Sequence, residues 1–379
     1  MELNGAAIII KSLLDEGVEK IFGYPGGAVL PLYDELFKQD KLKHILVRHE
    51  QGAAHAAEGF ARSSGKLGAI LVTSGPGATN TVTGLADAYL DSIPLLCITG
   101  QVPTPAIGSD AFQEADTVGI TRACTKHNYL VTNVEDLERI VKEAIHIATT
   151  GRPGPVVIDI PKDVQIALCK YQALKKVTRP SYQVQMKGDE AAIKKAVKLI
   201  ASAKKPLFYT GGGIINAGPK AAKLLTEFVE LTNAPITNTL MGLGGFPASK
   251  KQFLGMLGMH GSLEANMCMS ECDVMINIGA RFDDRITGKL DKFALNSKKI
   301  HVDIDPSSIN KNVMVDIPII GDAASVLERM ITLWKKEKHS INKTALNKWW
   351  AQIALWRKRK SFSYAQSKTT TKPQFALDR

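Results

Sequence analysis

One acidic side chain, Glu50, stands where a short apolar run meets a stretch rich in alanine and glycine, in the string RHEQGAAHAAEGFARSSGK at residues 48–66. A glutamate at the end of a strand is usually an exposed charge or is stabilised by the positive end of a helix. The small residues at 52–57 would let another surface pack closely and exclude water from the carboxyl group. Such a carboxyl group suits proton transfer, which makes Glu50 a candidate catalytic residue.

A turn, SGPGATN at residues 74–80, directly follows the apolar run GAILVT at 68–73. Glycines there let backbone amides approach a ligand, and a helix after the turn would direct its positive end toward the same place. The turn is not a Walker loop, because no Gly-Lys-Ser/Thr follows it. An ordinary strand-to-helix turn accounts for the string equally well.

The second half of the chain has four strings of glycines or acids at strand ends or in loops: GGGIINAG at 211–218, LGMLGMHGS at 254–262, GARFDDR at 279–285 and DIDPSS at 303–308. The first fails the dinucleotide fingerprint, because Asn216 stands where the third glycine belongs. Each string taken alone is better explained as an ordinary turn between a strand and a helix than as a cofactor site. Four together favour a nucleotide-type cofactor, whose diphosphate and ribose these residues could hold.

These strings require a scaffold, and the hydrophobic pattern predicts two α/β domains. In the first, the predicted strands are 44–47, 68–73, 94–99 and 155–160, and the predicted helices lie near 28–38, 52–63, 78–90 and 134–149. In the second, the strands are 206–210, 273–280 and 299–305, and the helices lie near 189–202, 218–232 and 323–338. Near-continuous apolar strands separated by helices indicate parallel sheets covered on both faces. Ligands of such sheets bind at the carboxyl ends of the strands, where the candidate strings lie.

The domain boundaries follow from the same pattern. We predict a first domain at 1–165, a polar and basic linker at 166–187, a second domain at 188–340 and a basic tail at 341–379 that contains tryptophan. The start of the chain predicts an amphipathic helix capped by Asn4. No secretory or transit peptide is expected there, because acidic residues occur from Glu2 onward and a cleavage-site pattern is lacking.

Composition excludes several classes of protein. No run approaches the ~18 to 20 apolar residues of a membrane span. The formal net charge is +11, but residues 323–379 hold 13 Lys/Arg against three Asp/Glu, so +10 of it lies in the last helix of the second domain and the tail. An amphipathic or solvated tail is favoured over a nucleic-acid-binding one, since the main body has no basic stripe. Five scattered cysteines indicate reduced thiols and an intracellular setting.

Taken together, the strings closely resemble the catalytic subunits of acetohydroxyacid (acetolactate) synthase, a family of thiamine-diphosphate enzymes. The matching strings are GYPGGAVLPLYD (23–34), RHEQGAAHAAEGFARSSGK (48–66), TSGPGATN (73–80), DAFQE (110–114), TKHNYLV (125–131), GRPGPVVIDIPKD (151–163), LGMHGS (257–262) and GARFDDRITGKL (279–290). The resemblance implies two three-layer α/β domains. The first would bind the pyrimidine of thiamine diphosphate, and the Rossmann-like central domain would bind FAD.

The resemblance also implies an activity. Pyruvate would be decarboxylated on thiamine diphosphate, and the two-carbon unit would pass to a second 2-keto acid, pyruvate or 2-ketobutyrate. This is the first common step of branched-chain amino-acid biosynthesis. Glu50 would hydrogen-bond N1′ of the aminopyrimidine and favour its imino tautomer. Phe112 and Gln113 would project into a neighbouring subunit's active site, and Lys162 would line its entrance.

The residues that match cofactor-contact positions of the family belong to both domains. For thiamine diphosphate they are Glu50, Gly75, Pro76, Gly77 and Asn80. For FAD they are Arg152, Gly211, Gly212, Gly213, Thr237, Leu240, Leu257, Gly258, Met259, His260, Gly261, Gly279, Arg281, Asp284, Asp303, Ile304 and Asp322. In this family FAD is needed structurally rather than for net redox chemistry.

One part of the family pattern does not occur. A third α/β domain of the family binds the diphosphate and Mg²⁺ through Gly-Asp-Gly followed downstream by Asn, whereas the only Gly-Asp pairs here are in KGDE (187–190) and IGDAA (320–324). We therefore expect no metal ligand among these 379 residues. We also expect the chain to be an incomplete fragment that is inactive alone.

The expected partners are the two 2-keto acids, at least one further copy of the chain and a regulatory small subunit, without nucleic acid or membrane. The expected compartment is the plastid stroma, for an organelle-encoded chain, or the bacterial cytoplasm. Pyruvate oxidase and glyoxylate carboligase are related alternatives. DAFQE and FDDRITGK argue against the oxidase, and Glu50 argues against the carboligase. A non-catalytic FAD-binding protein and, more remotely, a nicotinamide dehydrogenase remain alternatives of other classes.

Overall fold

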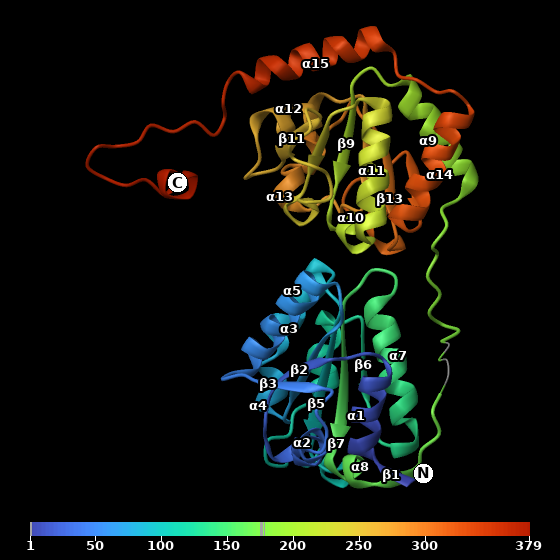
Figure 1. The fold of residues 1–379 in the computed structure, drawn as a ribbon, viewed down its shortest axis with the longest axis vertical. Coiled ribbons are helices and arrows are strands. Elements are labelled where there is room, and N and C mark those ends of the chain that lie inside the picture. The colour runs from blue at the N-terminus through green and yellow to red at the C-terminus, as the bar shows by residue number, and fades with distance from the viewer. Residues whose placement is uncertain (1, 175–176, 178) are drawn as a thin grey trace. The chain divides into compact units, whose positions relative to one another are not determined.

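The computed structural model describes residues 2–174, 177 and 179–379, which divide into two compact units, one ending at Val184 and the other beginning at Gln185 (Figure 1). Each unit is an α/β fold around a six-stranded parallel sheet, so the predicted fold class is confirmed. No helix among the described residues is long and apolar enough to cross a membrane.

The sheet of the first unit has the strand order β3-β2-β4-β5-β7-β6, and a separate antiparallel pair joins β1 to β8. The strands are β1 (Glu2–Asn4), β2 (Lys20–Tyr24), β3 (Lys43–Leu46), β4 (Gly68–Val72), β5 (Leu95–Gln101), β6 (His127–Leu130), β7 (Pro155–Pro161) and β8 (Leu168–Lys170). The helices are α1 (Gly5–Asp15), α2 (Leu30–Phe37), α3 (Glu50–Ser64), α4 (Pro76–Thr79), α5 (Val82–Asp91), α6 (Thr117–Thr121), α7 (Leu137–Thr149) and α8 (Lys162–Ile166).

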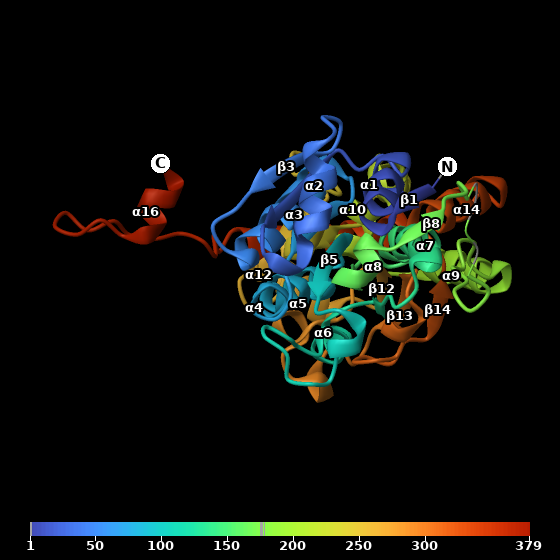
Figure 2. The ribbon, with the colours of Figure 1, turned by 90° about the horizontal axis from the view of Figure 1, so that it is seen from below.

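Two apolar cores cover the two faces of this sheet. On one face α1, α2 and α7 pack against alternate residues of the central strands, and on the other face α3 and α5 do so (Figures 1 and 2). Strands β4, β5 and β7 are buried along their whole length, as their unbroken apolar runs predict. Asn4 caps α1, because its Oδ1 accepts a hydrogen bond from the Ala7 amide at 2.7 Å.

Strand β3 differs from the expectation of a strand covered on both faces. It lies at the edge of the sheet and pairs only with β2 among the described residues. Its side chains are largely exposed, including Ile45 at 38% and Leu46 at 65%. An apolar run shows that a strand is hydrophobic, but it does not show whether this chain supplies the surface that covers it.

The segment expected to be a linker is partly held by the first unit. β8 pairs with β1, and Tyr182 Oη donates a hydrogen bond to the Thr150 carbonyl at 2.8 Å. Lys126 Nζ binds Tyr182 Oη at 3.0 Å and the Thr150 carbonyl at 2.8 Å. Tyr182 is therefore held against the end of α7.

The sheet of the second unit has the order β11-β10-β9-β12-β13-β14, with all neighbouring strands parallel. Its strands are β9 (Pro206–Thr210), β10 (Ile236–Asn238), β11 (Phe253–Met256), β12 (Val274–Ile278), β13 (Lys298–Asp303) and β14 (Ile317–Ile320). Its helices are α9 (Glu190–Ser202), α10 (Gly212–Asn216), α11 (Gly218–Thr232), α12 (Leu263–Glu271), α13 (Asp284–Thr287), α14 (Ala323–Lys336), α15 (Lys343–Arg357) and α16 (Pro373–Asp378).

The tail expected to begin at 341, outside the second domain, instead continues the core of the second unit. Leu346, Trp349, Ile353 and Trp356 of α15 are buried in the same apolar cluster as the sheet. Trp349 Nε1 also donates a hydrogen bond to the Pro206 carbonyl at 3.2 Å. Spacings of three and four residues place these four side chains on one helix face.

Replacing Trp349 by Ala is expected to destabilise the second unit. The side chain is 2% exposed, and truncating such an aromatic residue costs ~3–5 kcal/mol. Urea denaturation followed by circular dichroism measures the loss. Leu355→Ala, on the same helix but 56% exposed, serves as the control. A loss for Trp349→Ala no larger than that of the control would show that α15 does not belong to this core.

Candidate active site

Glu50 is the first residue of α3 and lies at the carboxyl edge of the first sheet, just after β3. The residue is half-buried, and its Oε2 accepts a hydrogen bond from Asn80 Nδ2 at 3.0 Å. Among the described residues Oε1 has no hydrogen-bond donor. The helix N-terminus favours a negative charge at this position. One oxygen is thus fixed by Asn80, and the other remains available to a ligand.

The Gly-Pro-Gly turn brings Asn80 to Glu50. The turn joins β4 to the short helix α4, with Gly75 at φ 55° and ψ −114°, a conformation that favours glycine. Gly77 has no side chain between Thr73 and Glu50, and a Cβ there would lie 3.7 Å from Glu50 Oε1. A Cβ on Gly77 would also lie 2.7 Å from Thr73 Cγ2, so glycine lets Thr73 pack against the turn, and the uncommitted oxygen of Glu50 is the atom left for a ligand.

Gly75→Ala is expected to destabilise the turn. The added Cβ would meet the Gln113 carbonyl oxygen at 2.5 Å, and φ at this position is positive. Strain of this type costs about 1–3 kcal/mol. Thermal unfolding measures the loss, and Gly52→Ala is the control, because a Cβ at Gly52 meets nothing within 4 Å. Equal melting temperatures for the two variants would contradict this account of the turn.

Three alanines of α3 lie in the apolar core and do not face the candidate site. Ala53, Ala54 and Ala57 are fully buried in the core between the sheet and α5. A Cβ on Gly84 of α5 would lie 2.4 Å from the Ala54 Cβ, so these small residues allow two helices to pack closely. Ala53, Ala54 and Ala57 therefore make no room for a cofactor ring, whereas a Cβ on Gly52 would meet nothing within 4 Å.

Phe112 and Gln113 lie in a segment that passes over the Gly75 turn. The Gln113 backbone is in contact with Gly75, and Gln113 itself has a φ of 57°. Both side chains are exposed, Phe112 to 88%. The structure therefore brings Gln113 to the turn next to Glu50, whereas the Phe112 side chain contacts little of its own unit.

Lys162 is the first residue of α8 and directly follows β7 at the same carboxyl edge of the sheet. Its side chain is half-buried. The neighbouring Asp163 accepts a hydrogen bond from the Thr104 amide at 2.9 Å, which holds the start of α8 against the segment that follows β5. The structure thus places Lys162 at the edge where Glu50 lies.

In the second unit, glycines let three loops meet at the carboxyl edge of the sheet. The Gly213 amide donates a hydrogen bond to the Gly279 carbonyl at 3.0 Å, and the Gly211 amide binds the Ile278 carbonyl at 3.2 Å. A Cβ on Gly213 would lie 2.6 Å from the Gly279 Cα, and one on Gly211 would lie 2.4 Å from the Gly279 oxygen. Side chains are excluded here, so the edge presents backbone.

Two buried polar atoms at this edge have no hydrogen-bond partner among the described residues. They are Thr210 Oγ1 at the end of β9 and Asn238 Oδ1 at the end of β10, and both residues are 0% exposed. Unsatisfied buried polar atoms normally have a partner such as water or a ligand. Together with the glycine backbone, these atoms fit a site for a nucleotide cofactor.

The other residues expected to bind FAD differ in position. The loop Leu257–Gly261 meets the GARFDDR string, because the Met259 amide donates to the Arg285 carbonyl at 2.8 Å. Thr237 is buried and bonds the Gly255 carbonyl. Of the remaining positions, Leu240 and Asp284 are exposed, and Arg281 and Ile304 are half-buried. Asp303 is buried beside His301, and Asp322 caps α14. Asp322 therefore already has a structural role.

Arg152 belongs to the first unit, whereas the other residues expected to bind FAD belong to the second. Its Nε donates to Ser92 Oγ at 2.8 Å, and its Nη2 donates to the Tyr89 carbonyl at 3.2 Å. The guanidinium group also lies 5.8 Å from the centre of the Tyr89 ring. In the structure Arg152 stabilises the carboxyl end of α5.

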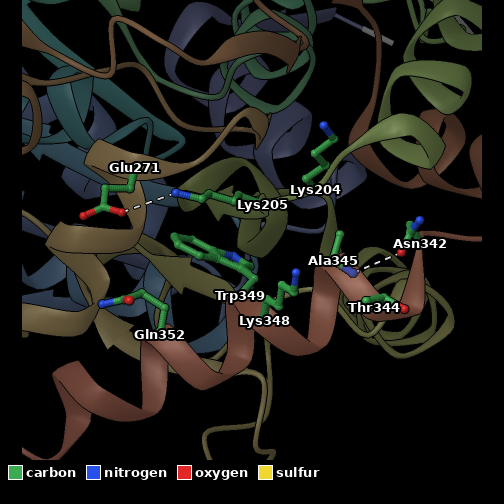
Figure 3. Close-up of a pocket in the computed structure, with 9 residues that line it drawn as sticks. All are labelled: Lys204, Lys205, Glu271, Asn342, Thr344, Ala345, Lys348, Trp349 and Gln352. Carbon is green, nitrogen blue, oxygen red and sulfur yellow. Dashed lines mark hydrogen bonds and ion pairs between the residues drawn. The ribbon is translucent and has the colours of Figure 1, made fainter.

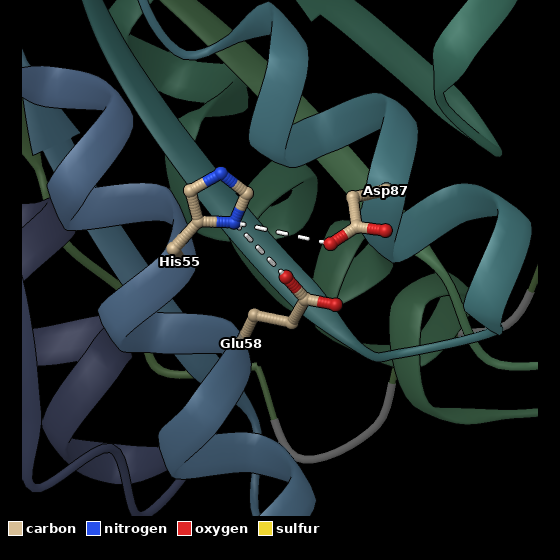
Figure 4. Close-up of side chains that lie close together, drawn as sticks. All are labelled: His55, Glu58 and Asp87. Carbon is tan, nitrogen blue, oxygen red and sulfur yellow. Dashed lines mark hydrogen bonds and ion pairs between the residues drawn. The ribbon is translucent and has the colours of Figure 1, made fainter. Parts of the chain in front are cut away.

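A cluster with metal-binding residue types occurs on α3 and α5, formed by His55, Glu58 and Asp87 (Figure 4). His55 Nδ1 lies 3.3 Å from Glu58 Oε2 and 3.9 Å from Asp87 Oδ2. The other oxygen of Glu58 accepts a hydrogen bond from Arg62 Nη2 at 2.7 Å. Because these partners satisfy Glu58, we interpret the cluster as an ion-pair group on the helix surface.

A hollow of about 460 Å³ lies at the amino end of the second sheet (Figure 3). Its walls include Lys204, Lys205 and Lys348, with Trp349 at the base. Lys205 is paired with Glu271 at 3.4 Å. Ligands of parallel sheets bind at the opposite, carboxyl edge, so we assign no cofactor to this hollow.

A buried acid was missed by the sequence analysis. Asp159 lies in the middle of β7 and is 1% exposed. Burial raises the pKa of Asp159 to about 7 from an ordinary value of 3.8, although hydrogen bonds from Thr99 and Gln101 oppose the shift. A single acid inside the unbroken apolar run PVVIDIP was the available signal.

Comparison with known proteins supports the thiamine-diphosphate interpretation. Residues 3–120 match the thiamine pyrophosphate enzyme N-terminal TPP binding domain, and residues 193–330 match the thiamine pyrophosphate enzyme central domain. The chain therefore belongs to the thiamine pyrophosphate enzymes.

Within that family, the chain is homologous along essentially its whole length to acetolactate synthase large subunits. It is 52% identical over 376 residues to the protein of Buchnera aphidicola subsp. Schizaphis graminum, covering 98% of this chain and 65% of the relative. It is 50% identical over 379 residues to the protein of Haemophilus influenzae, covering 100% of this chain and 66% of the relative. It is 49% identical over 378 residues to the isozyme 3 large subunit of Escherichia coli, covering 99% and 66%. The chain thus spans about two thirds of the length of these relatives.

Proposed function

We propose that the protein is an acetolactate synthase large subunit, which decarboxylates pyruvate and joins the two-carbon unit to a second 2-keto acid, pyruvate or 2-ketobutyrate. The observation that carries the proposal is the pair formed by Glu50 and Asn80 beside the Gly75–Gly77 turn, in a chain that is about half identical to proteins of that name.

Glu50 would hold the aminopyrimidine ring of thiamine diphosphate. Its Oε1 has no donor among the described residues and would accept the hydrogen bond of the ring, while Asn80 fixes Oε2. A carboxyl group there can share a proton with a ring nitrogen and so select the tautomer that the reaction needs. The cofactor, when bound, supplies the electron sink for decarboxylation. Gln113 and Lys162 would bound the space that the 2-keto acids enter.

FAD would bind at the carboxyl edge of the second sheet. It would lie against the backbone of Gly211, Gly212, Gly213 and Gly279, whose amides other than that of Gly212 already donate to backbone carbonyls. Thr210 and Asn238 would gain hydrogen-bond partners. No metal ion is assigned to the described residues, and Mg²⁺ would accompany the cofactor diphosphate on other residues. Tight FAD binding would be measured by the flavin absorbance of the purified protein.

The natural assembly would contain at least two copies of the chain and a regulatory small subunit, because its relatives are named as large subunits. The predicted compartments, plastid stroma or bacterial cytoplasm, remain predictions. The main alternative activity is that of pyruvate oxidase, another FAD-containing thiamine-diphosphate enzyme, which would form no new carbon–carbon bond.

The test is the product formed from ¹³C-labelled pyruvate by the protein as its natural host makes it, supplied with thiamine diphosphate, Mg²⁺ and FAD. NMR is expected to show acetolactate with label from two pyruvate molecules, without a requirement for an electron acceptor. Acetate or acetyl phosphate in its place, formed only with an electron acceptor, would contradict the proposal and favour the oxidase.

A further inference from the structure

The buried network around Asp159 has no part in the roles described so far. Asp159 accepts hydrogen bonds from Thr99 Oγ1 at 2.6 Å and from Gln101 Nε2 at 2.9 Å, both on the adjacent strand β5. A buried carboxylate is costly, and removing one of its donors leaves a charge without a partner. The network is therefore sensitive to each of its members.

Gln101 connects this network to a segment outside the sheet. Its Nε2 also donates to the Ala115 carbonyl at 2.9 Å, and its Oε1 accepts a hydrogen bond from the Val102 amide at 2.8 Å. Both N–H groups and the oxygen of the amide are thus in use, and Gln101 is only 3% exposed. Because Asp159 and Ala115 both accept from Nε2, the carboxylate fixes the orientation in which the amide reaches Ala115.

Ala115 belongs to the 111–117 segment, the stretch that carries Phe112 and Gln113. Two residues before Ala115, the Gln113 backbone touches Gly75 of the turn beside Glu50. Within the segment, Glu114 Oε2 accepts a hydrogen bond from the Ala111 amide at 3.0 Å. The segment is thus folded on itself and is joined to the sheet through the Ala115 carbonyl.

We propose that Gln101, oriented by Asp159, is a positioning residue that holds the 111–117 segment and thereby sets the place of Gln113 beside the Gly75 turn. It acts through Ala115 and does not itself contact a substrate. The catalytic consequence rests on the proposed function, in which Gln113 borders the space for the 2-keto acids. The positioning itself does not depend on that function.

Hydrogen exchange followed by mass spectrometry tests the proposal on the 379-residue chain without substrate or cofactor. Gln101→Met preserves side-chain length and removes the amide, so exchange in peptides covering 111–117 is expected to rise at least about tenfold, the consequence of losing a buried hydrogen-bonded group. Gln165→Met is the matched control. Gln165 is 0% exposed, and its amide binds the carbonyls of Ala28 and Ile160 at 2.8 and 2.9 Å.

If Gln101 only stabilises the fold, Gln101→Met and Gln165→Met would both lower the melting temperature, and neither would raise hydrogen exchange selectively at 111–117. That result would overturn the proposal. Should Gln101→Met not fold, Thr99→Val removes one donor to Asp159 while keeping the side-chain shape, and a several-fold rise confined to 111–117 is expected. Unchanged exchange in that variant would also overturn it.

The enzyme made by the natural host separates this inference from the proposed function. In it, Gln101→Met is expected to lower kcat for acetolactate formation without raising the KM for thiamine diphosphate, since Glu50 is untouched. If the wild-type enzyme forms no acetolactate but exchange at 111–117 rises as expected, the proposed function fails and the positioning role stands. If acetolactate forms and exchange does not change, only the positioning role fails.

Discussion

Replacing Glu50 by Gln is expected to reduce acetolactate formation by about 100- to 10,000-fold, the range that a positioned acid–base group contributes. The variant keeps the shape of the side chain and an oxygen that can accept the Asn80 hydrogen bond, but it cannot share a proton with the pyrimidine nitrogen. Steady-state kinetics with pyruvate, on the enzyme from a host carrying the altered gene, measures the effect.

Glu19→Gln is the control for this experiment. Glu19 is an exposed carboxylate that binds Lys66 Nζ at 2.7 Å and lies outside the candidate site. Its substitution is expected to leave kcat within about twofold of the wild type, because the pair is exposed to solvent and contacts no residue of the candidate site. A loss of less than tenfold for Glu50→Gln, with the control unchanged, would remove Glu50 from the mechanism.

Asp159→Asn is expected to change how the stability of the protein depends on pH. The pKa of Asp159 is raised by burial from 3.8 to about 7 in the folded chain. A raised folded pKa gives stability that is complete below the unfolded pKa and is lost as pH rises through about 7. The wild type should therefore lose about 3 kcal/mol relative to the Asn variant between pH 5 and pH 8.

Urea denaturation of both proteins at several pH values measures this difference. Asp163→Asn, four residues along the chain, is the control, since the Asp163 carboxylate is exposed and accepts a hydrogen bond from the Thr104 amide. Its stability relative to the wild type is expected to vary little over the same range, because exposed charges are screened by solvent. A constant difference between wild type and Asp159→Asn would show that Asp159 stays ionised throughout.

The sequence predicted the central strands of both sheets because each is an unbroken apolar run bounded by turn residues. β4, β5 and β7 are completely buried, and a fully buried strand needs no polar residue on either face. β2 and β6 were missed, since KIFGY and HNYL are short and mix polar with aromatic residues. The edge strand β14 was missed as well, because Pro318 interrupts its short apolar run.

The sequence singled out the residues of the candidate site, but it did not predict the contacts between them. The strings containing Glu50 and Asn80 were singled out separately, and only the fold shows that their side chains meet at 3.0 Å. The same holds for the contact between the Gln113 backbone and Gly75. These two residues are 38 positions apart in the sequence, and each has a positive φ. Contacts between strand ends depend on the order of strands in the sheet, which the periodicity of a sequence does not contain.

The role of Glu50 is tested most directly by exchange of the thiazolium C2 proton of bound thiamine diphosphate with deuterium, measured by rapid quenching and NMR on the enzyme that the natural host makes. The structure predicts that Glu50→Gln slows this exchange by at least about 100-fold, since the carboxyl group can no longer set the tautomer of the ring. Exchange at the wild-type rate in the variant, with the cofactor still bound, would contradict the assignment of Glu50 as the group that prepares the cofactor for reaction.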